Sequence, residues 1–189
     1  GWVGTRRRLL LYLVVATAIT GAIGFSFKDI IHELFESVAF AAAMLLVTGV
    51  LLFLSDRVKN PVRTEAEMNL LDGIVIGVIQ GIAVLPGISR SGSTITFGLF
   101  RGLEGQTAAR FSFLLSIPAI AGAAILEARH AEAVPPGEMT VYAAGALAAA
   151  VVAYMTLTFL FFVVRKRNLR FFAYYCWIVG AAVLALNLR

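Results

Sequence analysis

Long apolar runs separated by short polar stretches make up most of this chain. Each of five runs is long enough, with help from its flanking residues, to cross the ~30 Å hydrocarbon core of a bilayer as a helix. These runs cover residues 9–24, 38–54, 111–126, 139–164 and 171–188. We therefore predict an all-α integral membrane protein with about five transmembrane helices.

Two further apolar segments, 70–85 and 92–103, are too short to span the bilayer. At 1.5 Å per residue they reach only ~24 Å and ~18 Å as helices. Between them, Pro86 lacks an amide hydrogen and Gly87 accepts unusual dihedral angles, so the pair breaks the helix. We predict a re-entrant helix hairpin over residues 69–105, with its tip deep in the membrane and both ends on one side.

The remaining segments are short and polar. They comprise an amphipathic segment at 25–37, loops at 55–69 and 127–138, a turn at 101–110 and a basic turn at 165–170. None is long enough to fold by itself, so we expect residues 1–189 to form a single membrane domain.

The composition agrees with a membrane protein, since 60% of the 189 residues are hydrophobic, 14% are charged and the mean hydropathy is +0.88. The net charge of +5 lies in clusters between apolar runs. If the hairpin returns to its origin, twelve of the sixteen Lys and Arg residues fall on one side, which the positive-inside rule makes cytoplasmic. The clusters therefore indicate topology, and we expect no nucleic-acid partner. The single cysteine, Cys176, excludes an intrachain disulfide.

The candidate chemistry lies at the predicted hairpin tip. Arg90 is the only formal charge between residues 73 and 100, and a charge in a membrane segment is costly unless it faces a partner or a cavity. Hydroxyl groups surround it, from Ser89, Ser91, Ser93 and Thr94. A new helix starts at about Ser91, where free amides and the helix dipole favour an anion that a guanidinium can hold by two oxygens. Alternatively, the Pro-Gly kink is purely structural and the polar side chains satisfy freed carbonyls.

The tip sequence resembles the signature of a known family. The residues are Pro86-Gly87-Ile88-Ser89-Arg90-Ser91-Gly92-Ser93-Thr94-Ile95, preceded by Gln80-Gly81. The segment Phe111-Ser112-Phe113-Leu114-Leu115-Ser116-Ile117-Pro118 resembles the span that follows in that family. Both resemble the bacterial undecaprenyl-diphosphatase family of the bacitracin-resistance type, and the pattern of spans agrees from about Arg6 to the end of the chain.

The resemblance implies an enzyme that hydrolyses undecaprenyl diphosphate to undecaprenyl phosphate and inorganic phosphate, which recycles the lipid carrier of cell-wall synthesis. It implies a multi-pass protein of the bacterial plasma membrane, with two inverted repeats and a site open to the outer face. Catalytic contacts with the diphosphate are implied for Arg90 and Ser89, and phosphate contacts for Gly87, Ser91, Gly92, Ser93 and Thr94. Gln80 takes the position of a first-repeat glutamate, which implies a supporting role.

One part of the family pattern has no counterpart here. The family's N-terminal re-entrant segment carries glutamates and a Ser-Gly-His tip, whereas residues 73–103 contain no Asp or Glu. We therefore expect this chain to represent a part of the family fold and to be inactive alone. The resemblance implies a divalent cation such as Mg²⁺, but we identify no metal ligand in the sequence.

Two other functions stay open on the sequence. One is binding or flipping of a lipid phosphate without hydrolysis, because broken helices also build transporter sites. The other is an inactive remnant. The expected partners are a polyprenyl diphosphate and membrane lipids, and the sequence allows a homodimer.

Overall fold

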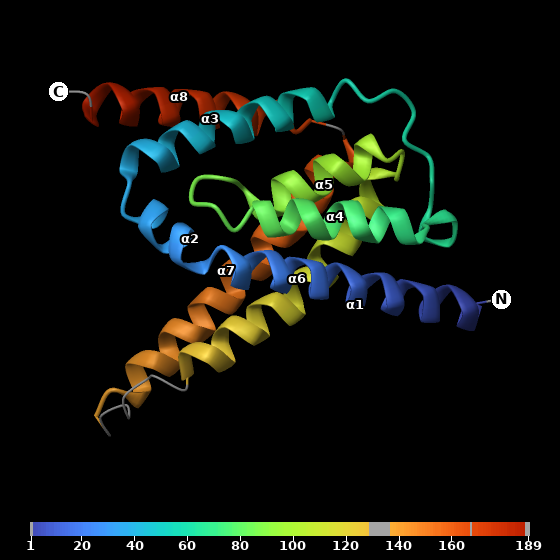
Figure 1. Cartoon of the computed structure of the whole chain (residues 1–189), viewed down its shortest axis with the longest axis horizontal. Helices are drawn as coiled ribbons and strands as arrows, with labels where there is room; N and C mark the ends of the chain where they lie inside the picture. The colour runs from blue at the N-terminus through green and yellow to red at the C-terminus, as the bar shows by residue number, and fades with distance from the viewer. Residues whose placement is uncertain (1, 129–136, 167, 188–189) are drawn as a thin grey trace.

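The computed structural model describes residues 2–128, 137–166 and 168–187, and these residues form helices joined by short loops (Figure 1). In chain order the helices are α1 (Trp2–Ser26), α2 (Lys28–Phe35), α3 (Val38–Ser55), a 3₁₀ turn η1 (Glu65–Glu67), α4 (Leu70–Ile82), α5 (Arg90–Phe100), α6 (Gly105–Ala128), α7 (Met139–Arg165) and α8 (Arg170–Asn187). The predicted all-α fold is confirmed.

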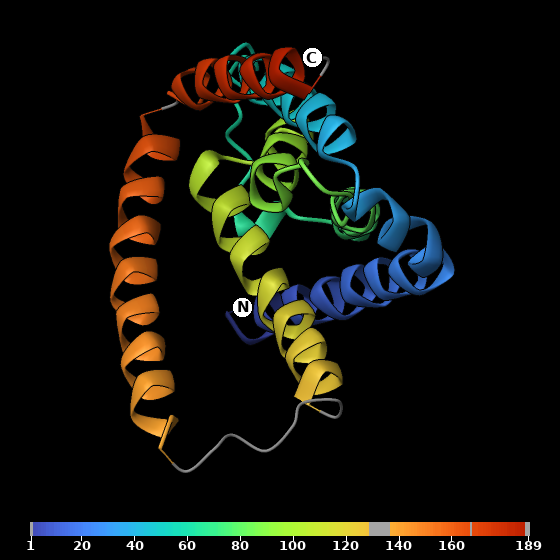
Figure 2. The same ribbon diagram turned by 90° about the vertical axis from the view of Figure 1, so that its left-hand side faces the viewer.

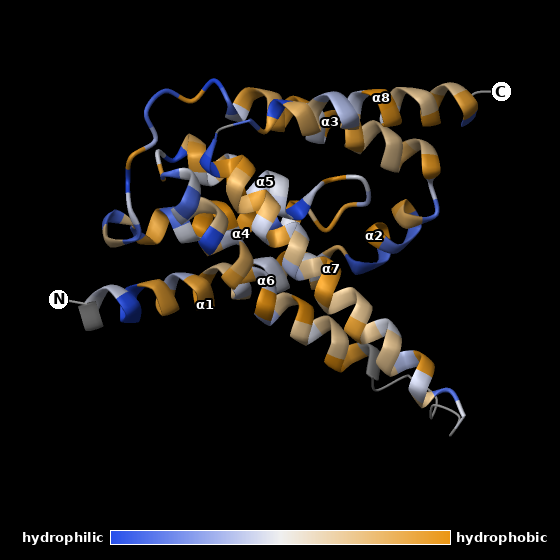
Figure 3. Ribbon diagram, turned by 180° about the vertical axis from the view of Figure 1, so that it is seen from behind, coloured by the Kyte–Doolittle hydropathy of each residue, from blue (hydrophilic) through white to orange (hydrophobic). Residues whose placement is uncertain are grey.

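Five helices are long and apolar enough to cross a membrane, as predicted. The spans are Gly4–Ser26, Val38–Ser55, Gly105–Leu126, Met139–Arg165 and Arg170–Asn187, and α4 is a shorter apolar helix. Figure 3 shows that hydrophilic residues gather at the start of α1, on α2 and in the connection from α3 to α4. Apolar residues dominate the long helices, so the described part of the chain is a multi-pass membrane protein.

Several helix boundaries differ from the predicted ones. Helix α1 begins at Trp2 and includes the three arginines that the prediction left outside the span. Helix α5 begins at Arg90, one residue before the predicted start at about Ser91, because the Ser89 side chain caps it. Helix α6 begins at Gly105, inside the predicted 101–110 turn. Most of the predicted 127–138 loop lies outside the described residues.

Small residues allow two helix pairs to pack closely. Helix α8 runs alongside α3 and helix α4 alongside α1 (Figure 1). A Cβ atom on Gly77 of α4 would lie 2.7 Å from the Cα of Ala16 on α1. On the other pair, the Trp177 indole N–H donates to the carbonyl of Leu46 at 3.2 Å, and its ring fills the space beside Gly49. Gly73, Gly77 and Gly81 recur at every fourth residue of α4 and all face α1, so this spacing serves close helix contact.

The hairpin of α4 and α5 lies in the middle of the fold. Helix α5 packs on α3, α4 and α6, and buried residues such as Ile95, Phe111 and Leu115 form the core around it. Helix α7 stands apart from α1 and most of its residues are exposed (Figure 2). The helices packed around α5 are thus α3, α4 and α6.

Candidate anion site

The connection between α4 and α5 is a tight turn over residues 83–89. At one position of this turn, residue 87, the backbone conformation requires glycine. Gly87 has a φ of +89°, a conformation that side chains disfavour. A Cβ atom there would also collide with the carbonyl oxygen of Ala41 on α3. The tip therefore lies directly against the backbone of α3.

One hydroxyl group on α3 fixes the tip. Thr48 is 1% exposed, and its Oγ1 donates to the carbonyl of Gly87 at 3.1 Å. The same oxygen accepts from the amide of Ser89 at 3.0 Å. Thr48 thus holds the backbone on both sides of Ile88 and sets where α5 begins. Thr48 could not be found from the sequence, because nothing near it marks a contact with Ser89, 41 residues away.

Ser89 caps α5 and leaves two amides free. Its Oγ accepts from the amide of Gly92 at 3.1 Å, and its carbonyl accepts from the amide of Ser93 at 2.9 Å. Within the described part of the chain, the amides of Arg90 and Ser91 have no acceptor. Two free N–H groups at the positive end of a helix favour an anion. The Ser89 hydroxyl, which accepts from Gly92, keeps its own hydrogen for donation.

Arg90 is the charged group at this helix start. It is half-buried, and its guanidinium forms no ion pair or hydrogen bond with any of the described residues. If the kink were purely structural, the Arg90 guanidinium would donate to the carbonyls that the kink frees. The Gly87 carbonyl is instead bound by Thr48, so the guanidinium is free to bind a ligand.

The other candidate residues are divided between the tip and the protein interior. Ser91 and Gly92 are half-buried beside Ser89. Thr94 is fully buried, and its hydroxyl contacts the carbonyls of Arg90 and Ser91 and the Ser112 hydroxyl on α6, the last at 2.6 Å.

Two further candidates lie under the tip. Ser93 is 2% exposed and its hydroxyl has no partner among the described residues. Gln80 is 1% exposed and faces α1, where its Nε2 donates to the Thr20 hydroxyl at 3.4 Å. The structure brings Ser89, Arg90, Ser91 and Gly92 together, and places Ser93, Thr94 and Gln80 in the packing beneath them.

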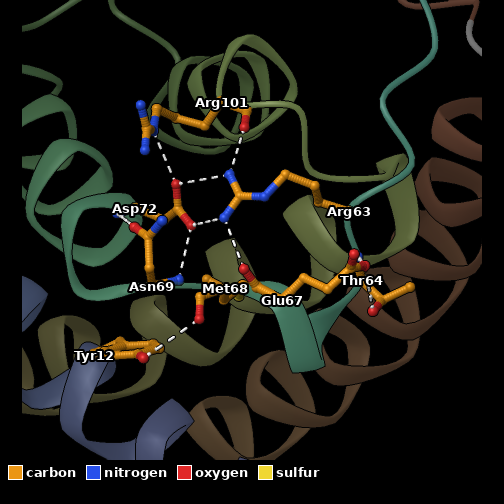
Figure 4. Close-up of polar contacts among 8 residues, drawn as sticks. All are labelled: Tyr12, Arg63, Thr64, Glu67, Met68, Asn69, Asp72 and Arg101. Atoms are coloured by element: carbon orange, nitrogen blue, oxygen red, sulfur yellow. Dashed lines mark hydrogen bonds and ion pairs between the residues drawn. The ribbon is translucent and has the colours of Figure 1, made fainter.

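The open end of the hairpin is closed by an ion-pair cluster that the sequence analysis missed (Figure 4). Asp72, in the first turn of α4, has a fully buried side chain. Its Oδ2 lies 2.8 Å from Nη2 of Arg63, and its Oδ1 lies 2.8 Å from Nε of Arg101. Arg63 also donates to the carbonyl of Arg101 at 2.7 Å. The two ends of the hairpin therefore meet, as a returning hairpin requires.

Local hydrogen bonds complete this cluster. Asp72 and Asn69 form a capping box at the start of α4, and the Tyr12 hydroxyl donates to the Met68 carbonyl at 3.3 Å. The Thr64 amide and hydroxyl both donate to Glu67, which lowers the pKa of that exposed carboxyl below its usual value. Such bonds make the polar connection before α4 a defined structure instead of an open loop.

A divalent cation does not fit the groups present at the tip. Hard cations prefer several carboxylate or carbonyl oxygens. Among the described residues, no three His, Cys, Asp or Glu side chains gather in one place. Asp72, the buried carboxylate, is bound by two arginines at the opposite end of the hairpin. We therefore derive no chemical step through a metal from these residues.

The fold and the tip geometry favour a class of protein: multi-pass membrane proteins with a candidate anion site on a helix hairpin. The comparison with known sequences is more specific. Residues 3–182 match the family described as bacitracin resistance protein BacA, and the chain belongs to this family.

Several curated relatives carry the name undecaprenyl-diphosphatase. The one from Syntrophotalea carbinolica is 44% identical over 181 residues, covering 96% of this chain and 69% of the relative. The one from Halothermothrix orenii is 42% identical over 183 residues, covering 96% and 71%. The relative from Methanothermobacter thermautotrophicus is 42% identical over 179 residues and is covered over 99% of its length. The chain thus spans about two thirds of the length of some relatives and nearly all of another.

Proposed function

We propose that this chain binds the diphosphate group of a polyprenyl diphosphate at the tip of the α4–α5 hairpin, as part of an undecaprenyl-diphosphatase. The observation that carries the proposal is that, among the described residues, the guanidinium of Arg90 and the two amides beside it at the start of α5 have no partner. The relatives' name, undecaprenyl-diphosphatase, supplies the substrate and the reaction.

The tip residues can divide the work of holding a diphosphate. The guanidinium of Arg90 can hold two phosphate oxygens in a planar fork, and the amides of Arg90 and Ser91 can donate to a third. The Ser89 hydroxyl can donate its hydrogen to a phosphate oxygen while it accepts from Gly92. Because Thr48 and Gly87 fix the backbone, these donors are in place before the ligand arrives. Donors fixed in this way stabilise the charge that moves onto oxygen as a P–O bond breaks.

A second function, binding of a lipid phosphate without hydrolysis, is favoured by one observation. Residues 73–103 contain no Asp or Glu, no carboxylate lines the cavity at the tip, and none of the described carboxylates pairs with Arg90, so these contacts supply no general base. We expect this chain alone to release phosphate from undecaprenyl diphosphate at the background rate, and to bind the ligand all the same. Release of inorganic phosphate once the chain is co-expressed with the family's N-terminal re-entrant segment would favour the enzyme. Tight binding without release in both preparations would favour the carrier.

Substitution of Arg90 tests the site directly. Hydrogen bonds to charged groups are worth about 1.5–3 kcal/mol. We expect Arg90→Lys to weaken diphosphate binding about tenfold, because a lysine cannot form the fork, and Arg90→Ala to weaken it about 100-fold. Both should keep the thermal stability of the parent in detergent, since no described residue pairs with the guanidinium. The control is Arg57→Lys, a change at an exposed arginine 4.9 Å from the Phe53 ring.

Binding can be measured by calorimetry with inorganic diphosphate and with a soluble prenyl diphosphate. In any form of the enzyme that turns over, Arg90→Lys should also lose ~10²–10³ in kcat, the usual effect of one preorganised electrostatic contact. Unchanged affinity in both Arg90 variants, or loss of affinity only in step with loss of folded protein, would contradict the proposed site.

We further propose that the protein lies in the plasma membrane with its basic segments in the cytoplasm and the tip site open to the outer face. Cysteines at the exposed positions Asn60 and Gln106 flank the two ends of the hairpin. A membrane-impermeant maleimide should label both only after the cells are opened. A cysteine at Lys28, in α2, should be labelled on intact cells. Labelling of Gln106 from outside would exclude this orientation.

A further inference from the structure

A cavity of about 340 Å³ begins at the hairpin tip and extends between α3, α5, α7 and α8. Three hydroxyl-bearing residues, Thr48, Ser89 and Ser91, line it at the tip beside Gly92, and Thr156 and Tyr175 carry the hydroxyls farther along its wall. The rest of its wall is mainly apolar or aromatic, with side chains that include Leu45, Leu52, Ile95, Phe159 and Phe172. The cavity therefore has the Ser89 and Ser91 hydroxyls, which flank Arg90 in the chain, at one end and a wall suited to hydrocarbon.

A second cavity, of about 480 Å³, lies next to the first and shares three of its lining residues, Phe159, Phe172 and Tyr175. The rings of Phe159 and Phe172 pack edge to face, with centroids 6.4 Å apart. The second cavity is also mainly apolar and continues along α7 and α8 to Val163 and Phe171. The walls of the two cavities thus define a mainly apolar route from the tip to the junction of α7 and α8, where Lys166 and Asn168 line its end.

We propose that this route binds the isoprenoid chain of the ligand, with the first isoprene units in the cavity at the tip and the following units beside the Phe159–Phe172 pair. This inference rests on the proposed function, because it assumes that the diphosphate binds at Arg90. It adds the place and direction of the hydrocarbon chain, which the anion site alone does not determine.

The size of the tip cavity fits part of such a chain. An apolar cavity of about 150 Å³ holds one benzene molecule, so about 340 Å³ holds roughly a dozen carbon atoms, or two to three isoprene units. Transfer from lipid to this cavity gives little hydrophobic gain, because lipid tails are as apolar as leucine side chains. The cavity therefore acts through shape: it orients the chain so that the diphosphate reaches the amides of α5.

A substitution at the cavity wall tests this assignment without disturbing the core. Thr156 lines the tip cavity from α7 and is exposed, so Thr156→Trp fills the cavity without displacing a packed side chain. The matched control is Met155→Trp, because Met155 is adjacent, 65% exposed and absent from both cavity walls. The probe is a prenyl diphosphate of three isoprene units with a diazirine on its last unit, added to the detergent-purified chain.

After irradiation, we expect the probe to label residues of α7 and α8 around the two cavities, and excess inorganic diphosphate to suppress the labelling. Thr156→Trp should reduce the labelling at least about tenfold, since one misplaced methylene in an apolar pocket already costs 10–200-fold, and Met155→Trp should not. Affinity for inorganic diphosphate, measured by calorimetry, should be the same in the parent and both variants.

The outcomes separate this inference from the proposed function. If inorganic diphosphate binds but the label lies elsewhere, or both tryptophan variants are labelled like the parent, the proposed route of the isoprenoid chain is wrong and the anion site stands. Labelling that diphosphate does not suppress would mean that an ordinary lipid chain fills the cavities, which also overturns the inference. If inorganic diphosphate does not bind the parent, the proposed function fails, and this inference with it.

Discussion

Thr48→Val removes the hydroxyl group that fixes the hairpin tip and keeps the shape of the side chain. The hydroxyl donates to the Gly87 carbonyl and accepts from the Ser89 amide, at 3.1 and 3.0 Å, so the valine leaves both backbone groups without their partner. A buried polar group that loses its hydrogen bond costs about 1–3 kcal/mol. Because the tip is half-buried, water can replace part of the lost hydrogen bonding. We therefore expect the free energy of unfolding to fall by about 2–4 kcal/mol.

The local effect can be measured by hydrogen exchange in detergent. In Thr48→Val, the tip can open without breaking a hydrogen bond from the Ser89 amide to residue 48. The amide hydrogens of a peptide covering residues 86–92 should therefore exchange roughly tenfold faster than in the parent. Diphosphate affinity should fall too, because displacement of the Ser89 amide moves the start of α5 and the donors of the site. Thermal unfolding and calorimetry on the same preparation give the global stability and the affinity.

Two control variants isolate the cause. Thr48→Ser keeps the hydroxyl and should keep the slow exchange and the affinity. Thr158→Val removes a hydroxyl that bonds only to the Tyr154 carbonyl of its own helix, and should leave the tip unchanged. If Thr48→Val exchanges at residues 86–92 as slowly as the parent, the tip is held by other contacts and the reasoning is refuted.

Two further substitutions test the hairpin. Asp72→Asn leaves two partly exposed arginines without their shared carboxylate and should reduce the free energy of unfolding by about 2–4 kcal/mol, measured by thermal melting. Glu65→Gln removes a partly exposed carboxylate 3.6 Å from the exposed Arg110 and should cost under about 1 kcal/mol; equal melting of the two variants would contradict the cluster's role. Gly87→Ala adds a Cβ against the Ala41 carbonyl at a φ of +89°, so we expect fast exchange at the tip and lost diphosphate binding; parent-like binding would show that the turn can move.

The sequence by itself determined the membrane class, the five spans and the hairpin. In a bilayer, the backbone N–H and C=O groups of a long apolar run are satisfied only if the run forms a helix, and the length of the run decides whether the helix spans the membrane. These features therefore follow from local composition. The tip could be located for a similar reason. A lone arginine between helix-breaking residues is unusual enough to mark Arg90 and Ser89, and the resemblance carried by those residues agrees with the family that the comparisons show.

Only the tertiary structure decided how the tip is held and which of its polar groups remain free. Thr48 lies 41 residues from Ser89, and Asp72 meets Arg101 across the whole hairpin, contacts that no local pattern encodes. The run of hydroxyls after Arg90 also looks uniform in the sequence. Successive positions on a helix face different neighbours. Thr94 therefore packs against α6, whereas Ser91 lines the cavity.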